Sequence, residues 1–191
     1  MPDVQARIAP FINVRFLITS EWWEQRGSRY HKGLDLATSP VSSGVGHHLY
    51  SMVNGHVIRK AFDGSGYGNY IIMEDDTTHD AFLYGHMYQV DVNEGDSIVV
   101  GQQVGIEGTT GSSTGVHLHL EMQNLTNHAW VYNAEQDIAL NPCIFMGIPN
   151  VKGTWCYYDG TPVPPIPPTP TETKKKKYPW VLYANKLRNR F

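Results

Sequence analysis

Residues 49–160 consist of short apolar or alternating segments separated by turn-forming residues, and this spacing limits the fold more than any other feature of the chain. The stretch NYIIMED, followed by DDTTHD and DAFLYGHM, predicts a hairpin. Asn54-Gly55 lies between two alternating stretches and predicts another, because this dipeptide favours the tight turns that join antiparallel strands. No long segment has helical periodicity, although TSEWWEQR has room for a helical turn or two. We therefore predict a mainly β fold of antiparallel sheets with few short helices.

The composition is that of a globular chain with one domain and an additional segment. With 191 residues, 41% of them hydrophobic, the chain is long enough to bury one core. It has no run of about 18 apolar residues, so we expect no membrane span. The first residues, MPDVQARIAPFINVRF, lack an apolar stretch ending in small residues, so we expect no signal peptide. Two cysteines, Cys143 and Cys156, allow one disulfide at most and exclude a cysteine-rich zinc cluster.

A proline-rich segment divides the chain into parts of opposite charge. Residues 1–160 carry 8 Lys/Arg and 17 Asp/Glu, a net charge of −9, whereas residues 161–191 carry 7 and 1, a net charge of +6. The six prolines of residues 161–173 predict an extended linker without a packed core. Residues 174–191 form a basic tail with aromatic residues. Its lysine run fits a solvated segment as well as an attachment arm, and the tail contains no recognisable nucleic-acid-binding module.

The sequence GVHLHLEM, residues 115–122, places two histidines two residues apart in an apolar run. In a strand His117 and His119 would share one face, because successive side chains point to opposite faces. A lone histidine on a strand is usually solvated or hydrogen-bonded. A pair on one face is a good start for a metal site or an acid/base pair, since neutral imidazole is a common metal ligand and titrates near neutral pH.

Candidate partners for this pair occur upstream. The stretch YHKGLDLA contains His31 and Asp35 four residues apart, and LYGHMYQ contains His86. Taken alone, the motif of His31 and Asp35 would most often be a surface turn. A catalytic zinc typically has three nitrogen or oxygen ligands from the protein and an open fourth position, and two histidines with one aspartate fit that number.

These motifs, taken in order, carry a family resemblance. The pattern H-x-x-x-D at residues 31–35, Y-G-H at 84–86 and the passage VNEGDSIVVGQQVGIEGTTGSSTGVHLHLEM resemble the lysostaphin/LytM-type zinc endopeptidases of bacterial cell walls. The resemblance extends over residues 20–148, and LNPCIF near residue 140 is similar to the segment that closes such domains. It implies the sandwich-like antiparallel fold of that family, of the duplicated hybrid motif type, over residues 1–160.

The resemblance also implies roles for the five residues. His31, Asp35 and His119 correspond to the zinc ligands of the family, and His86 and His117 to its catalytic pair. Zinc chemistry provides a nucleophile without any serine or cysteine. One histidine of the pair would act as general base, and the other would stabilise the oxyanion or protonate the leaving amine. The pattern does not say which of His86 and His117 has which role.

Three further residues are predicted to bind substrate: Tyr84, Asn69 and Ser113. Ser113 lies in GSSTG, which matches the nucleophile elbow of serine hydrolases. That elbow requires a helix after the serine, whereas an alternating strand pattern follows here, so we place Ser113 in a loop beside the metal site.

The chain departs from the family pattern without losing a ligand. Many relatives have a second histidine in the first motif or a Phe-Gly pair upstream, whereas this chain has Tyr30 before His31 and Trp22-Trp23 upstream. We expect these changes to reshape the substrate groove. The intact ligand set favours an active enzyme.

The resemblance implies a zinc-dependent endopeptidase that hydrolyses cross-bridges or stem peptides of bacterial peptidoglycan. The alternative is a wall-binding or structural module without catalysis. A small peptidase domain with a proline linker and a basic tail is typical of a bacteriophage tail lysin, so we expect a location in the virion tail or outside the cell at the wall. The tail would then bind phage tail proteins. Alternatively, an enzyme released by lysis would use it to hold anionic wall polymers.

Overall fold

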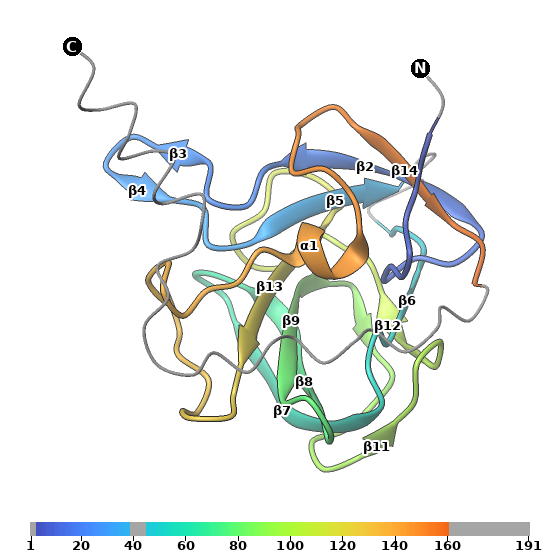
Figure 1. Ribbon diagram of the computed structural model, residues 1–191, viewed down its shortest axis with the longest axis vertical. Coiled ribbons are helices and arrows are strands. Elements are labelled where there is room, and N and C mark those ends of the chain that lie inside the picture. Colours follow the sequence, from blue (N-terminus) through green and yellow to red (C-terminus); the bar gives the residue numbers. More distant parts are fainter. Residues whose placement is uncertain (1–2, 39–44, 161–191) are drawn as a thin grey trace.

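The part of the chain before the proline-rich segment forms a β-rich domain (Figure 1). The computed structural model describes residues 3–38 and 45–160. The predicted linker, residues 161–173, and the predicted tail, residues 174–191, lie outside the described residues. Within the described ranges no helix combines the length and the apolar character needed to cross a membrane.

A large sheet runs through the domain in the strand order β1-β14-β2-β5-β13-β9-β8-β7-β11. Its strand pairs are antiparallel except β1 and β14, which are parallel. In Figure 1 the strands β2, β5 and β14 occupy the upper part of the molecule, and β7, β8 and β9 curve through the lower part. The strands are β1 (Val4–Gln5), β2 (Val14–Ser20), β5 (Leu34–Thr38), β7 (Gly55–Asp63), β8 (Gly68–Asp75), β9 (Asp80–Met87), β11 (Ser97–Ile98), β13 (Leu118–Asn124) and β14 (Trp155–Tyr158).

Two smaller sheets and one short helix complete the described residues. The order β10-β12-β6 joins Gln89–Val90, Gln103–Ile106 and His48–Tyr50. The hairpin of β3 (Gln25–Arg26) and β4 (Arg29–Tyr30) projects to one side of the molecule (Figure 1). The helix α1 (Pro142–Met146) begins after the N-cap Asn141 and ends at Gly147, which adopts the left-handed conformation.

The mainly β, antiparallel prediction is confirmed, and so is the hairpin of β8 and β9. The Asn54-Gly55 hairpin prediction is wrong. Strand β6 pairs with β12 and β7 pairs with β8, so Asn54 and Gly55 join strands of different sheets. Neither residue has the positive φ that a tight type I′ turn requires. TSEWWEQR forms the end of β2, a turn and β3, so the prediction of a helical turn there is also wrong.

The hydrophobic core lies against one face of the large sheet, and a second apolar cluster covers part of the other. The core includes Phe16, Ile18, Leu36, Leu118 and Leu120. The second cluster consists of Tyr70, Ile72, Ala81 and Leu83, with Leu125 and Trp130 packed against it. Strand β9 is buried along its whole length because both of its faces are covered. The cysteines Cys143 and Cys156 are free and buried.

Candidate metal centre and active site

Strand register brings the predicted metal ligands together. Strand β13 pairs with β5 on one side and with β9 on the other, and His119 lies opposite Asp35 in the first pair and opposite Gly85 in the second. His31 lies in the short segment between β4 and β5. Gly33 makes room for this arrangement, because a Cβ there would lie 2.5 Å from Cε1 of His119.

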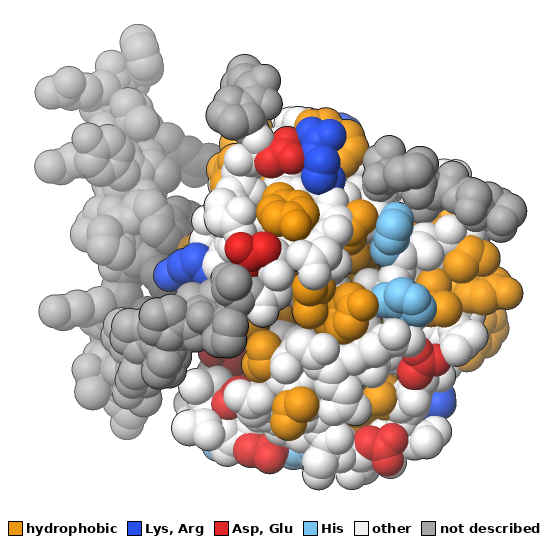
Figure 2. Space-filling model, turned by 90° about the vertical axis from the view of Figure 1, so that its right-hand side faces the viewer, with side chains coloured by type: hydrophobic (Ala, Val, Ile, Leu, Met, Phe, Trp, Pro, Cys, Tyr) orange, Lys and Arg blue, Asp and Glu red, His pale blue; other side chains and the backbone are white. Residues whose placement is uncertain are grey.

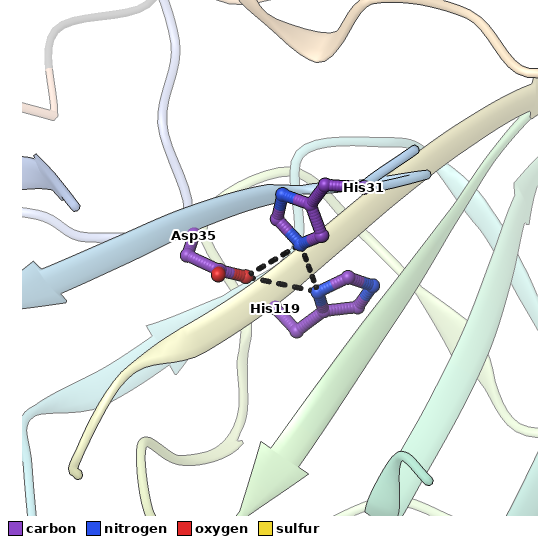
Figure 3. Close-up of side chains that lie close together, drawn as sticks. All are labelled: His31, Asp35 and His119. Carbon is purple, nitrogen blue, oxygen red and sulfur yellow. Dashed lines mark hydrogen bonds and ion pairs between the residues drawn. The ribbon is translucent and has the colours of Figure 1, made fainter. Parts of the chain in front are cut away.

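The donor atoms of His31, Asp35 and His119 form a nearly equilateral triangle (Figure 3). Nε2 of His31 lies 3.1 Å from Nδ1 of His119 and 3.1 Å from Oδ1 of Asp35. Nδ1 of His119 lies 2.9 Å from the same carboxylate oxygen. Two ligands at about 2.0–2.1 Å from a tetrahedral zinc lie roughly 3.3 Å apart, so the triangle fits such an ion with little adjustment.

The other ring nitrogen of each ligand histidine faces a hydrogen-bond acceptor. Nδ1 of His31 donates to the carbonyl oxygen of Glu21 at 3.0 Å, and Nε2 of His119 donates to the Glu121 carboxylate at 3.1 Å. These donations place the protons of the neutral rings away from the triangle. Two imidazole lone pairs and a carboxylate oxygen therefore converge at about 3 Å, an arrangement that a bound cation stabilises. This convergence is the observation of the structure that fits a metal ion.

The surroundings of the triangle favour positive charge. Burial disfavours an imidazolium at His119, but its hydrogen bonds to Asp35 and Glu121 outweigh burial and raise the pKa of His119 to about 9. Burial raises the pKa of Asp35, yet the hydrogen bonds with His119 and His31 hold that pKa well below its usual range. A proton would occupy this place in the absence of a metal ion.

Two residues that the sequence analysis did not single out support His119. Oε1 of Glu121 accepts the hydrogen bond of His119 and a second one, at 2.9 Å, from the Tyr67 hydroxyl. Burial, together with the charge of Glu121, raises the pKa of Tyr67 and keeps the hydroxyl protonated as a donor. The alternation of His117, His119 and Glu121 on one strand face was a signal that could have identified Glu121.

The predicted catalytic pair lies beside the triangle. The rings of His86 and His117 are 4.7 Å apart between centroids, and Nε2 of His117 lies 3.7 Å from Oδ1 of Asp35. Nδ1 of His86 donates to the Thr110 carbonyl at 2.9 Å, and Nδ1 of His117 donates to the Gly115 carbonyl at 2.8 Å. Each neutral ring therefore has its lone pair on Nε2.

The backbone of His86 is held in an unusual conformation. Its φ is 62°, in the left-handed region that non-glycine residues rarely adopt. The amide of His86 donates to the Tyr67 carbonyl at 2.6 Å. Thr110 also fixes the conformation of His86. Its amide donates to the His86 carbonyl at 3.3 Å, and its carbonyl accepts a hydrogen bond from the His86 ring. Burial lowers the pKa of His86 to about 4, so this imidazole is neutral at pH 7. Strained residues held by several contacts are concentrated at functional sites.

The site opens into two adjoining hollows of about 440 and 790 Å³. Both are lined by Arg26, Asp35, Thr114 and His117, so together they form one groove that passes the triangle. The larger hollow also contacts the remaining site histidines and the β3–β4 hairpin. The face drawn in Figure 2, on another side of the molecule, carries acidic side chains that are spread singly.

The predicted substrate-binding residues occupy three different environments. Ser113 lines the larger hollow, and its hydroxyl lies 3.3 Å from Nδ1 of His117. Asn69 is not among the residues that line the two hollows, and its side chain donates to the Met87 carbonyl at 3.1 Å. Tyr84 is fully buried in the core, and its hydroxyl donates to the Tyr50 carbonyl. The prediction for Tyr84 is therefore corrected, because this side chain presents no surface to a substrate.

Comparisons with known proteins agree with the fold. The sequence model of Peptidase family M23 matches residues 29–134, more than half of the chain. The glycyl-glycine endopeptidase ALE-1 of Staphylococcus capitis is 29% identical over 123 residues, 58% of this chain and 33% of that protein. The peptidoglycan DD-endopeptidase ShyB of Vibrio cholerae is 34% identical over 92 residues, 48% of this chain and 20% of that protein. The chain thus matches a third or less of the length of these relatives.

A solved structure extends the likeness to three dimensions. The catalytic domain of EnpA, a prophage-encoded M23 protein from Enterococcus faecalis, superposes with a TM-score of 0.55 at 25% sequence identity. The superposition covers 71% of this chain and 95% of that domain. The fold and the histidine-aspartate triangle match a β-sheet domain of a metallopeptidase family. The chain belongs to peptidase family M23, and its relatives include proteins named as endopeptidases of glycyl-glycine bonds and of peptidoglycan.

Proposed function

We propose that the protein is a zinc-dependent endopeptidase that hydrolyses peptide bonds in the cross-bridges or stem peptides of bacterial peptidoglycan. The observation that carries the proposal is the convergence of three lone-pair donors, from His31, Asp35 and His119, beside a second histidine pair. Zinc, when bound by these three residues, supplies Lewis-acid activation of a water and polarisation of the scissile carbonyl.

His86 and His117 would handle the protons of the reaction. Both rings donate through Nδ1 to backbone carbonyls, so both offer Nε2 as a proton acceptor. One of them accepts a proton from the attacking water, and the other stabilises the developing oxyanion or protonates the departing amine once it carries a proton. The carbonyls of Thr110 and Gly115 fix both rings before substrate binds.

The shape of the groove favours cleavage within a chain. Hollows on both sides of His117 and Asp35 leave room for substrate residues before and after the scissile bond. An exopeptidase would instead need a wall or a charged group that stops one end of the substrate. ALE-1 is named a glycyl-glycine endopeptidase and ShyB a DD-endopeptidase, so both kinds of bond are candidate substrates of this chain.

The decisive experiment is digestion of purified peptidoglycan of known bridge type, analysed by mass spectrometry. We expect new amino termini, loss of the activity on chelation and its return when zinc is added. Turnover that persists in fully demetallated protein would contradict the proposal. Unaltered fragments from a zinc-loaded protein that sediments with walls would favour the alternative of a non-catalytic wall-binding module.

We further propose that the enzyme acts in a bacteriophage tail, at the outside of the host wall. The prophage origin of the EnpA domain and the opposite charges of residues 1–160 and 161–191 support this setting. Deleting residues 161–191 tests it: we expect loss of incorporation into virions with retained hydrolysis by the free domain. Normal incorporation of the truncated protein would contradict docking through these residues.

A further inference from the structure

A charged side chain reaches the predicted metal ligand Asp35 from outside the triangle. Nη2 of Arg26 lies 3.1 Å from Oδ2 of Asp35, whereas Oδ1 of the same carboxylate faces the two ligand histidines. Arg26 belongs to the projecting β3–β4 hairpin. The hairpin therefore places a guanidinium beside the carboxylate oxygen of Asp35 that faces away from the two histidines. The two oxygens of Asp35 thus have different partners.

Arg26 is itself held in place by polar neighbours. The same Nη2 lies 2.5 Å from the hydroxyl of Ser20, and Nε lies 3.5 Å from the carboxylate of Glu24. The Ser20 hydroxyl donates in turn to Glu24, whose other oxygen lies 3.7 Å from the Lys152 ammonium. Ser20 is paired with Asp35 across β2 and β5, so the sheet fixes its backbone beside Asp35. These contacts hold the Arg26 side chain in place between the surface residue Lys152 and the predicted metal ligand Asp35.

We propose that Arg26 is a positioning residue that makes Asp35 bind the metal through Oδ1 alone. A free carboxylate can bind a cation through one oxygen or through both. The charge-assisted hydrogen bond from Arg26 occupies Oδ2, so that only Oδ1 binds the metal. The restriction keeps the number of protein ligands at three and preserves the position that a catalytic site must leave open. The inference rests on the metal chemistry of the proposed function.

The alternative is that the Arg26–Asp35 contact is an ordinary surface ion pair. The Arg26 side chain is 49% exposed, and exposed pairs contribute little to stability. The two cases differ in metal affinity. Loss of a group that orients a metal ligand typically lowers affinity by about 10–100-fold, whereas loss of a surface pair leaves it unchanged.

The test compares Arg26→Gln with Arg29→Gln. Arg29 is paired with Arg26 across the same hairpin and is exposed, and its side chain has no hydrogen-bond or ion-pair partner among the described residues. Zinc affinity is measured on the full chain by competition with a chromophoric chelator. Cobalt substitution adds a second readout, because the visible absorption of Co²⁺ weakens when its coordination number rises above four.

We expect Arg26→Gln to lose about tenfold or more in zinc affinity and to show weaker cobalt absorption. Arg29→Gln should match the wild type in both readouts. Arg26→Lys should recover part of the affinity, because it keeps the charge but loses the forked geometry of the guanidinium. Melting of the metal-free proteins shows whether each variant is folded, and if Arg26→Gln is not, the comparison is made with Arg26→Lys.

Equal zinc affinity and equal cobalt spectra in the folded Arg26 variant, Arg29→Gln and the wild type would overturn the inference. Neither measurement uses a substrate. A wild-type chain that binds zinc but releases no wall fragments would therefore contradict the proposed function and leave this test intact. Conversely, active enzyme with unaltered metal binding in the variant would contradict only the role of Arg26.

Discussion

His117 and His119 lie on one strand face, yet opposite ring nitrogens point into the site. Glu121 accepts from Nε2 of His119 and leaves Nδ1 for the triangle, whereas the Gly115 carbonyl accepts from Nδ1 of His117 and leaves Nε2. The shared face could be predicted from alternation alone. The tautomers could not, because they depend on a carbonyl in the preceding loop and a carboxylate supported by Tyr67.

The two histidines should therefore respond differently to replacement. We expect His117→Ala to retain bound zinc and lose about 10²–10⁴-fold in wall hydrolysis, because it removes a proton-transfer group. His119→Ala should lose both zinc and activity, because it removes a ligand. Zinc content after gel filtration and the release of amino termini measure the two effects. Loss of zinc from His117→Ala would show that the assigned roles are wrong.

At the scale of elements, strand β13 has one face in the site and the other in the core, because successive side chains point to opposite sides. Its odd-numbered residues His119 and Glu121 belong to the site, whereas Leu118 and Leu120 pack in the core. A slip of one residue would exchange the faces, so core packing fixes the register that brings His119 opposite Asp35.

Replacing Leu120 tests this division of the strand. Leu120 is fully buried, and Leu120→Ala should lower the free energy of unfolding by about 2–5 kcal/mol while zinc affinity of the folded protein changes little. Val99→Ala is the control, since Val99 is 59% exposed and its loss should cost roughly 0.5 kcal/mol or less. Urea denaturation measures both variants. A small effect in Leu120→Ala would mean that the core does not hold this register.

The elements differ in how well the sequence predicts them. The β8–β9 hairpin follows from two short apolar runs separated by a polar turn. Asn54-Gly55 has the local signal of a hairpin, but β6 finds its partner in β12, far along the chain. The caps of α1, Asn141 and Gly147, were visible signals that the strand-based prediction did not use. The β3–β4 hairpin has two-residue strands without periodicity, so the approach of Arg26 to Asp35 could not be predicted.

At the scale of the whole molecule, the order of motifs predicted the family and the three residues of the triangle. Whether a given side chain faces the site or the core depends on long-range packing. Tyr84 shows the difference. It precedes Gly85 and His86 in a motif that resemblance assigns to the site, yet alternation along β9 turns its side chain into the core. His86 remains at the site because its positive φ reorients the strand end. Neither outcome follows from residue types alone.

The free cysteines provide a readout of global unfolding. Cys143 is 1% exposed and Cys156 is fully buried, and burial raises the pKa of Cys143 to about 12 and that of Cys156 to about 11. Thiolates are the reactive form, so we expect neither residue to be alkylated at pH 8 in the native protein. Labelling should begin only when the domain unfolds.

Metal binding should delay that labelling. A ligand that binds the native state stabilises it by about 2.7 kcal/mol at a free concentration of 100 times Kd, so zinc should raise the temperature at which both thiols react. His119→Ala should show no zinc-dependent shift, because it lacks a ligand, whereas His117→Ala should shift like the wild type. Mass spectrometry of alkylated protein over a temperature series measures the effect. Equal shifts in His119→Ala and the wild type would mean that the stabilising zinc binds elsewhere, since the triangle of His31, Asp35 and His119 would then contribute nothing to the stability of the fold.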